Sequence, residues 1–539
     1  MSDPPSVFNL WTAPWIRVTR RDGAGAELGL GACLAEAHAL AGLHDPSPLV
    51  AAGTHRLLTA ILQAIYAPQD LAEIATVLRA GQFDPVKLDG FAAQYADRFD
   101  LFHPTAPFLQ TGDVPLDGWK KPEKGQKHDW ADPKPIAALF VEVPAETNRS
   151  HFHHVTDEGH KLCAACCARG LVTIAAFASS GGAGIRPSIN GVPPIYVLPA
   201  GSSLFESLTL SLTTQGYQPP TADPQRANLA AWSGQTTVGK GTQVSAVGYL
   251  ESLTFPARRM RLYPQGVTTT CTHCGAATQV TVSSLLFEMG HWLSEGSALW
   301  EDPFAAFRKP KSKGKAADVG PKPIRPDEGK ALWREYSGLL LAQNDGQIRP
   351  KVVQQMGSLI QNRRVLTELH SIRFRCVSIR NPPGKAIIHE WLDEALEAPS
   401  ALLTDDDAAQ YIDNALGRAD EARFILESSF DSHFRPERDR GGRNEKLARF
   451  KTVRARMTAD YWRRLAPLFR RFIVDLADGA TREVTELAWA ATLVREGKQA
   501  FATAADQVGE RADALRARVE AQATCHRRLA AKRKEWFGE

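Results

Sequence analysis

Residues 162–171 read LCAACCARGL and residues 271–275 read CTHCG, so two Cys-x-x-Cys pairs lie about a hundred residues apart. A tight turn at each pair presents two sulfurs on one side, and four thiolates complete a tetrahedral site for one zinc ion. The pairs Cys163/Cys166 and Cys271/Cys274 use half of the 8 cysteines in the chain. The sequence therefore predicts a structural zinc knuckle that joins two distant segments.

A disulfide, or a set of plain thiols, is the alternative interpretation of these four cysteines. Nothing else in the sequence indicates an oxidising compartment, which favours the metal. A redox Cys-x-x-Cys motif is disfavoured because the βαβ pattern of thioredoxins is not visible around either pair. We expect Cys167 to be a buried thiol, and Cys33, Cys376 and Cys525 to be ordinary core or surface thiols.

The composition is that of a soluble globular protein with room for several domains. The mass is 59.0 kDa, with 43% hydrophobic and 23% charged residues. No apolar run reaches the roughly 18 residues that suggest a membrane span. The opening MSDPPSVFNLW lacks a basic region followed by an apolar stretch, so we expect no secretory signal and a cytoplasmic location.

The pattern along the chain changes from mixed to helical. Residues 8–23 predict an extended stretch that ends in an Asp-Gly turn, and helical periodicity follows at 34–44 and 48–66. The run 195–198 has β character, and the run 208–212 is also apolar and could pack beside it. Short strands are expected between 245 and 305. From about residue 386 the pattern is helical to the end. We predict an α+β body, residues 1–385, followed by a C-terminal helical bundle, residues 386–539.

Charge is unevenly distributed around the start of this bundle. Residues 391–430 contain 10 acidic and 2 basic residues, whereas residues 435–471 contain 13 basic and 4 acidic residues. A basic block of this kind attracts a phosphate backbone, or it is a solvated helix face neutralised by the acidic neighbour. Helical spacing predicts one buried stripe, made of Tyr461, Leu465, Leu468, Phe472 and Leu476. A different face carries Arg463, Arg464, Arg470 and Arg471.

Residues 308–330 form the clearest flexible segment. They include 8 basic and 3 acidic residues, with several prolines and glycines and almost no apolar side chains. Such a composition cannot bury a core, so we expect a mobile basic loop. It is either a phosphate contact or a solvated insertion.

A histidine-rich segment precedes the first cysteine pair, and its chemistry is open. Its members are His151, His153, His154, Asp157 and His160. They suit metal binding or acid–base catalysis, but no HExxH motif or two-metal carboxylate set accompanies them. A zinc-dependent nuclease or hydrolase that uses this cluster is therefore one alternative function. His160 or His273 replacing one cysteine ligand is another minor possibility.

The glycine run at 181–184 indicates a close approach of backbone to another molecule or segment, because glycine has no Cβ. No Lys-Ser/Thr follows it, so it is not a P-loop, and the strand–helix context of a dinucleotide site is missing. There is no GxSxG elbow either. A zinc-ribbon scaffold that binds nucleic acid without a guide RNA is the second alternative function.

Taken in order, these landmarks resemble one family, the large subunit (CasA family) of the type I-E CRISPR Cascade surveillance complex. The opening FNLWTAPWIRV and the segment APFLQ at 106–110 are similar to that family's N-terminal motifs. Thr147-Asn148 and Phe152 then precede the first cysteine pair, as in the family. The glycine run, the second cysteine pair and a helical C-terminus follow in the family's order.

The resemblance implies a non-catalytic subunit with an α+β body, structural zinc and a four-helix bundle. Such a subunit contacts the 5′ handle of the guide RNA and reads the protospacer-adjacent motif (PAM) of double-stranded target DNA from the minor groove. It helps to open the duplex into an R-loop and recruits a helicase-nuclease in trans. The implied partners include the backbone, handle-binding and small subunits of Cascade, and no membrane.

The resemblance also assigns roles to individual positions. It places the PAM glycine loop at Gly181, Gly182 and Gly184. The guide-RNA handle loop falls at Asn148, Phe152, His153 and His154. The strand-separating wedge falls at Asn381, Pro382, Pro383 and Gly384, and the face for displaced DNA at Arg463, Arg464, Arg470 and Arg471. The zinc ligands are Cys163, Cys166, Cys271 and Cys274.

Two departures from the family concern how the PAM is read. The family's best-known members have a glutamine in the wedge, where this chain has Asn-Pro-Pro-Gly. They also have a PAM-reaching lysine a short distance after the second cysteine pair, and residues 289–291 contain none. Either His291 or a residue such as Arg258 replaces that lysine, or the PAM preference differs.

Overall fold

A computed structural model of the chain divides into two compact units. The first, here called the body, comprises Met1–Asp327 and Asn344–Glu397. The second, here called the helical unit, comprises Glu328–Gln343 and Ala398–Glu539. The structure describes residues 7–120, 125, 127–141, 143, 159–179, 184–219, 226, 228–234, 237–294, 300–309, 321–341, 343–344, 346–363, 370–381, 388–435, 445–509 and 512–538. The predicted functional division at residue 385 stays a prediction.

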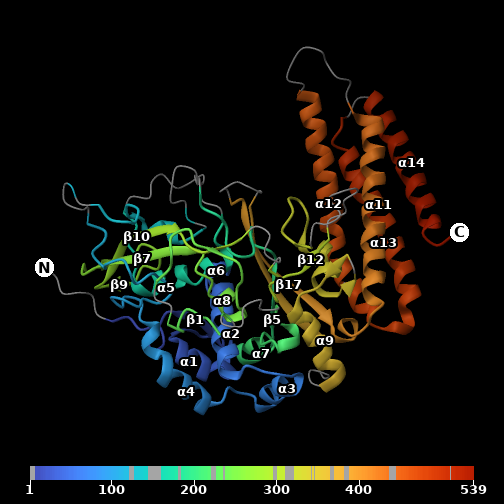
Figure 1. Cartoon of the computed structure of the whole chain (residues 1–539). Coiled ribbons are helices and arrows are strands. Elements are labelled where there is room, and N and C mark those ends of the chain that lie inside the picture. The colour runs from blue at the N-terminus through green and yellow to red at the C-terminus, as the bar shows by residue number, and fades with distance from the viewer. Residues whose placement is uncertain are drawn as a thin grey trace. The chain divides into compact units, whose positions relative to one another are not determined.

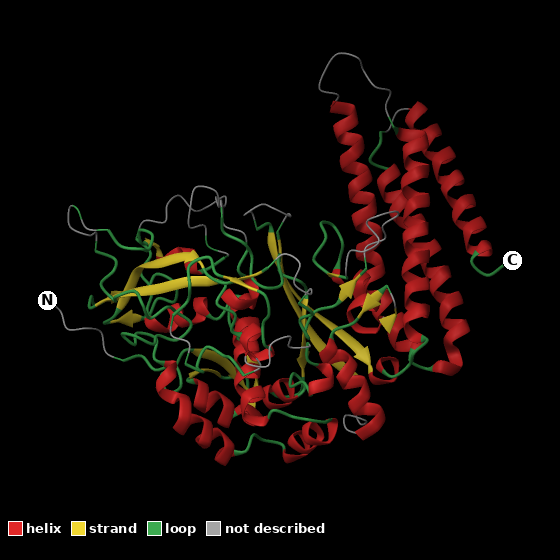
Figure 2. Ribbon diagram, in the orientation of Figure 1, coloured by secondary structure: helices red, strands yellow, loops and turns green. Residues whose placement is uncertain are grey.

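The body is a mixed α+β unit of short helices and small sheets, as predicted (Figures 1 and 2). Its helices are α1 (Leu30–Ala35), α2 (Pro48–Tyr66), α3 (Leu71–Ala80), α4 (Pro85–Tyr95), α5 (Ala164–Leu171), α6 (Ile174–Phe177), α7 (Leu204–Thr209), α8 (Tyr249–Leu253) and α9 (Lys351–Arg363), with the short helical turns η1 (Ala37–Ala39), η2 (Ala96–Phe99), η3 (Ile136–Leu139) and η4 (Gln215–Tyr217).

The strands form several separate sheets. Their orders are β2-β1-β3, β4-β10-β7, β17-β16-β5, β13-β12-β15-β14, and the pairs β8-β9 and β6-β11. Their bounds are β1 (Ile16–Arg20), β2 (Gly25–Leu28), β3 (Leu40–Leu43), β4 (Lys134–Pro135), β5 (Tyr196–Ala200), β6 (Gln243–Val244), β7 (Arg258–Gln265), β8 (Thr269–Thr270), β9 (Ala277–Thr278), β10 (Thr281–Met289), β11 (Trp292–Leu293), β12 (Phe307–Arg308), β13 (Lys322–Pro323), β14 (Gln343–Asn344), β15 (Gln347–Ile348), β16 (Ser371–Arg380) and β17 (Glu390–Pro399).

Helix α2 is the central element of the body. Every residue from Pro48 to Gln63 is buried, which is expected of a helix that is apolar on nearly all sides. Proline at the first helical position is preorganised for the helix start, and the helix ends at Ala67 in the left-handed region. The predicted helix at 48–66 is thus confirmed at both ends.

Of three predictions about local structure, two were wrong or only partly right. Residues 390–399 are not helical, because β17 pairs with β16 and its acidic residues form cross-strand ion pairs, including Asp393 to Arg375 at 2.7 Å. The apolar run 208–212 overlaps the end of α7, and α7 packs beside β5. The hydroxyl of Ser203, the N-cap of α7, accepts from the Glu206 amide. The 34–44 segment divides between α1, η1 and β3.

The predicted basic loop at 308–330 lies partly outside the described residues. Its two ends are described, and they are ordered as an antiparallel pair, with Phe307 opposite Pro323 and Arg308 opposite Lys322. Ile324 is buried beyond this pair.

The helical unit consists chiefly of four long helices (Figures 1 and 2). These are α11 (Ala408–Phe434), α12 (Glu445–Leu476), α13 (Arg482–Ala505) and α14 (Ala512–Glu535), with the short α10 (Ser400–Leu403) and η9 (Gly479–Thr481). The predicted apolar stripe on α12 is buried at Tyr461, Leu465, Phe472 and Leu476, and half-buried at Leu468. In the part of the chain that the structure describes, no helix is both long and apolar enough to cross a bilayer.

A segment from the middle of the sequence completes this unit. Residues 328–343, here called the strap, contain η7 (Leu332–Glu335) and η8 (Ser337–Leu341). The ring of Trp333 lies 4.8 Å from that of Phe469 and 5.7 Å from that of Trp462. The Arg334 guanidinium stacks over Trp462 at 3.8 Å. The strap therefore covers the apolar side of α12.

Candidate metal centre and nucleic-acid-binding loops

The four predicted zinc ligands come together in the body. The sulfurs of Cys163, Cys166, Cys271 and Cys274 all lie within 4.8 Å of one another, so the set can hold one metal ion. Cys163 Sγ and Cys274 Sγ are 3.8 Å apart. Among the described residues all eight cysteines are free thiols, which leaves the disulfide alternative without support. Neither His160 nor His273 belongs to the cluster.

Each cysteine pair is placed by a different local structure. Cys163 is the N-cap of α5, and Cys166 sits in the first turn, where the helix dipole favours thiolates. Cys271 and Cys274 lie in the turn between β8 and β9, and Gly275 follows in the left-handed region with φ of 75°. The Gly275 amide donates to the Cys271 carbonyl at 2.9 Å, which closes that turn.

Backbone hydrogen bonds join the two cysteine turns directly. The Leu162 and Val282 backbones exchange two hydrogen bonds of 2.9 Å, and the Thr272 amide donates to the Lys161 carbonyl at 2.9 Å. The Cys163 amide donates to Cys271 Sγ at 3.3 Å. Segments about 110 residues apart are thus held together even before a metal binds.

A buried arginine supports the centre from behind. The Arg169 guanidinium approaches Cys166 Sγ to 3.6 Å and donates to the Trp15 carbonyl at 2.7 Å and to Glu27 at 2.6 Å. Its side chain is 2% exposed. Because a positive charge stabilises thiolate, Arg169 complements a four-cysteine site with a metal. No pattern in the sequence indicated this role, since the Trp15 and Glu27 partners are far away along the chain.

The protonation of the cysteines reflects their crowding. The pKa of Cys166 is raised mainly by hydrogen bonding with the sulfurs of Cys163 and Cys271, and to a smaller extent by burial. The hydrogen bonds that Cys271 accepts from Cys163 and Cys166 lower its own pKa. Four thiolates in this space would require a cation, so the set suits a bound metal ion.

The cysteines outside the cluster behave as predicted. Cys33, Cys167, Cys376 and Cys525 are fully buried. Burial raises the pKa of Cys33 and of Cys525 to about 12, so these thiols stay protonated and unreactive at neutral pH.

Two predicted loops lie largely outside the described residues. These are the handle loop with Asn148, Phe152, His153 and His154, and the glycine loop at Gly181 and Gly182. The last member of the glycine run, Gly184, is exposed and has φ of 82°, a conformation that favours glycine. The structure does describe how the two ends of the glycine loop are fixed.

Arg258 fixes both ends of the glycine loop. One amino group of its guanidinium donates to the Ser179 carbonyl at 2.6 Å, and the other donates to the Arg186 carbonyl at 2.8 Å. The side chain of Arg258 is among the largest fully buried in the chain. A guanidinium presents donors in a rigid fork, so it can hold two carbonyls at a set separation. We call this arrangement the Arg258 clamp.

Neither residue proposed to replace the family's lysine faces solvent. Arg258 is occupied in the clamp, and His291 is 4% exposed, with burial lowering its pKa. One exposed cation nearby is Arg186, whose guanidinium stacks on the ring of Trp292 at 3.8 Å. Sequence reasoning missed Arg186, although it closely follows the glycine run.

The proposed wedge is described only at its first residue. Asn381 follows β16 and is 8% exposed, whereas Pro382, Pro383 and Gly384 lie outside the described residues. The two strands that flank this stretch, β16 and β17, are hydrogen-bonded neighbours, so the stretch connects the arms of a hairpin.

The four arginines of the predicted DNA face differ in their surroundings. Arg463 and Arg471 have side chains that are 74% and 82% exposed, and Arg470 is also exposed. Arg464 is partly buried and donates to Asp460 at 2.6 Å, and Arg463 donates to the same carboxylate. Asp460 therefore neutralises part of the face, while the exposed guanidinium groups remain within reach of a large ligand.

Comparison with known proteins identifies the family. A family profile described as CRISPR-associated protein Cse1 matches residues 9–500. The CRISPR-associated protein CasA/Cse1 of Thermus thermophilus is 28% identical over 543 residues, which cover 93% of this chain and 98% of the relative.

Solved structures show the same fold. Cse1 from Thermobifida fusca superposes with a TM-score of 0.77 at 22% identity, covering 100% of this chain and 99% of that one. Cse1 from Acidimicrobium ferrooxidans gives 0.76 at 22% identity, covering 99% and 100%. A chain of a structure described as a CRISPR RNA-guided surveillance complex gives 0.70 at 20% identity, covering 97% and 100%. The chain therefore belongs to the CRISPR-associated Cse1 (CasA) family, the large-subunit family of the type I-E Cascade complex, as its sequence motifs predicted.

Proposed function

We propose that this protein is the large subunit of a type I-E Cascade complex. In this proposal it recognises the PAM of duplex DNA, contacts the 5′ handle of the guide RNA, helps to form the R-loop and recruits a helicase-nuclease. It acts with the backbone, handle-binding and small subunits and is not itself a catalyst. Family membership across residues 9–500 carries the proposal.

The glycine loop is proposed to read the PAM from the minor groove. That groove distinguishes A·T from G·C only coarsely, so a loop with little side-chain bulk can read its shape and its base edges with backbone groups. The Arg258 clamp supports this role because it sets the distance between Ser179 and Arg186, the ends of the loop. Arg186, stacked on Trp292, is proposed as the cation that enters the groove.

The remaining parts are proposed to act on strands and guide. Phe152 would stack on an unpaired base of the handle, with His153 and His154 beside it, at a gain of roughly 1–3 kcal/mol per stacked base. The stiff prolines of the wedge would open a base step that costs a few kcal/mol to unstack. Since RNA–DNA pairing nearly compensates for the lost DNA pairing, a small contribution from the protein suffices.

Zinc is proposed to be structural. It would be held by Cys163, Cys166, Cys271 and Cys274, and four sulfur ligands close the tetrahedron to substrate or water. The ion would then hold the segments next to the handle loop and the glycine loop to the strand pair β8-β9.

The decisive experiment is purification together with the neighbouring gene products, followed by sequencing of the bound RNA. A repeat-derived 5′ handle is expected. The reconstituted complex should bind PAM-bearing duplex more tightly than PAM-less duplex, and Gly182→Leu and Arg186→Ala should reduce that difference. Arg98→Ala, which changes an exposed arginine elsewhere in the body, is the matched control.

Two results would overturn parts of the proposal. An equal loss of binding to PAM-bearing and PAM-less DNA would show that the glycine loop reads no PAM. Nicking of DNA by the isolated chain with Mg²⁺, Mn²⁺ or Zn²⁺, lost in a His153→Ala/His154→Ala variant, would instead establish the nuclease alternative.

A further inference from the structure

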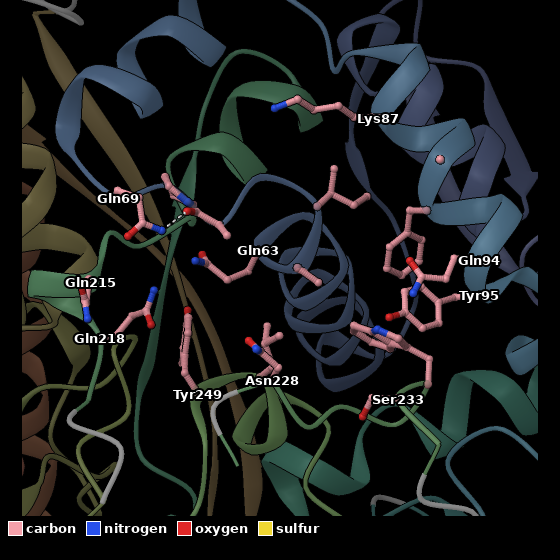
Figure 3. A pocket seen from close by; sticks show the side chains of 18 residues that line it. Gln63, Gln69, Lys87, Gln94, Tyr95, Gln215, Gln218, Asn228, Ser233 and Tyr249 are labelled. Atoms are coloured by element: carbon pink, nitrogen blue, oxygen red, sulfur yellow. Dashed lines mark hydrogen bonds between the residues drawn. The ribbon is translucent and has the colours of Figure 1, made fainter. Parts of the chain in front are cut away.

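A polar cavity in the body has no role in the function described so far (Figure 3). Its volume is about 670 Å³, which is within the usual size range of small-ligand sites. Its walls come from the C-terminal end of α2, from α4, η4 and α8, and from residues 228–233.

The chemistry of the walls is almost entirely neutral. Side-chain amides and hydroxyls dominate, there is no carboxylate among the lining residues, and the one charged group is the ammonium of Lys87. The amides belong to Gln63, Gln69, Gln94, Gln215, Gln218 and Asn228. A site of this composition does not suit a metal cation, which would need carboxylates, or a polyanion, which would need several basic side chains.

Several of these polar groups have no partner within the described chain. The amides of Gln94, Gln215 and Asn228 are exposed and make no hydrogen bond to another described residue. The Tyr249 hydroxyl is buried, with the residue 3% exposed, and it forms no well-aligned hydrogen bond there either, although the Thr213 hydroxyl is near. Burial raises the pKa of Tyr249, so this group stays a donor. Figure 3 shows Tyr249 among the lining residues, with its hydroxyl oxygen enclosed by the protein.

Aromatic rings form a rigid part of the wall. Phe91 lies 5.0 Å from Tyr95 and packs edge-on against Trp232 at 5.8 Å between ring centroids. Phe91 and Trp232 are buried, so of these three rings the half-buried Tyr95 is the one that a ligand can reach. Amides and rings together are the groups that recognise nucleobases, since asparagine and glutamine pair with base edges and aromatic side chains stack on base faces.

We propose that this cavity binds an unpaired nucleobase of single-stranded nucleic acid, recognised by its neutral edge and held against the ring of Tyr95. The inference rests on the proposed function, because a protein that opens a duplex produces unpaired bases next to itself. Lys87 lines the same cavity and supplies the single positive charge for the attached phosphate.

A cavity-filling variant tests the proposal. Gly90 lines the cavity on α4, and a Cβ added there meets no atom within 4 Å, so Gly90→Leu projects into open space. Gly417→Leu on α11 is the matched control, since that helix glycine also has no neighbour within 4 Å. Leucine is a better helix former than glycine, and neither variant is expected to lower the melting temperature.

The probe is a short oligodeoxyadenylate that contains 2-aminopurine, whose fluorescence falls when it stacks on an aromatic ring. Wild-type protein and Gly417→Leu are expected to bind and quench it. Gly90→Leu should bind roughly tenfold more weakly, as expected for one lost base stack, and should not quench. Unchanged affinity and quenching in Gly90→Leu would overturn the proposal.

Two further outcomes are distinguishable. If the oligonucleotide does not bind, and α4 becomes protected from hydrogen exchange only when partner subunits assemble, the occupant is a polypeptide and the nucleobase proposal fails. Binding of the complex to PAM-bearing duplex reports separately on the proposed function, because Gly90→Leu should leave it unchanged.

Discussion

Two ion pairs, one in the body and one in the helical unit, use charge in opposite ways. In the body, Arg56 and Asp302 form an ion pair at 2.7 Å whose side chains are only 2% and 1% exposed. In the helical unit, Arg463 pairs with Asp460 on the surface, with side chains 74% and 19% exposed. The first pair joins residues 246 positions apart, whereas the second spans three positions of one helix.

This difference shows which charges hold the fold together. Buried ion pairs are costly to break, because removing one partner leaves a charge without compensation. Surface pairs contribute little and exchange readily with solvent or ligand. A buried arginine such as Arg56 therefore fixes distant segments in place, while an exposed arginine of α12 such as Arg463 can contact a ligand without loss of the fold.

The largest expected effect concerns the cysteine cluster, which also joins distant segments of the body. Cys271→Ser, or chelation of the metal, should remove one zinc per chain and destabilise the body by several kcal/mol, because zinc binding and folding are coupled. Metal analysis and urea unfolding measure both. Cys167→Ser should keep the zinc. A Cys271→Ser protein with full zinc content would contradict the assignment.

Asp302→Asn tests the buried pair itself. It should lower the free energy of unfolding of the body by about 3–5 kcal/mol, since Arg56 stays buried without its counter-charge. Asp460→Asn on α12, the matched control, should cost less than about 1 kcal/mol. Equal losses in the two variants would remove the contrast between the units.

The body should also lose stability in acid. Burial, with the nearby charges of Arg375 and Arg56, lowers the pKa of His55 to about 3. In the unfolded chain the pKa of histidine is about 6.5. Between that pH and about 3, the unfolded state therefore binds a proton at His55 that the folded state does not bind. The free energy of unfolding should then fall by up to about 1.4 kcal/mol per pH unit, until roughly pH 3. His55→Gln should show a shallower dependence, and an identical dependence would exclude His55 as a source.

The smallest effect on stability, and the clearest on binding, is expected from the exposed arginines. Charge reversal at Arg463, Arg464, Arg470 and Arg471 should change stability by at most about 1 kcal/mol. It should weaken DNA binding and make its salt dependence shallower, because fewer counterions are released. Titration of duplex at several salt concentrations measures this. A slope equal to that of wild type would mean that this face is not the DNA track.

The sequence predicted the features that depend on local spacing. The cluster of four cysteines was predictable because the spacing within each Cys-x-x-Cys pair indicates a shared metal site whatever the rest of the fold. Helix α2 and the buried stripe of α12 follow from periodicity. The assignment to the Cse1 family followed from the order of several short motifs.

Features that depend on partners distant in the sequence were not predictable. Strand β17 was taken for helix because its acidic residues were counted with the neighbouring helix, whereas in the fold they pair across to β16. Arg258 was considered a possible DNA contact, and only the structure shows both of its carbonyl partners. The cavity beside α4 also brings together segments that are far apart along the chain.

The strap at 328–343 has a consequence for how the protein is made. Synthesis produces these residues before any of α11 to α14, so Trp333 has no apolar surface to cover until the C-terminal helices emerge. A fragment that starts at residue 398 lacks the strap altogether and leaves Phe469 and Trp462 uncovered. Such a fragment should associate with itself through that apolar side. The same fragment with residues 328–343 joined to it through a short linker should stay monomeric.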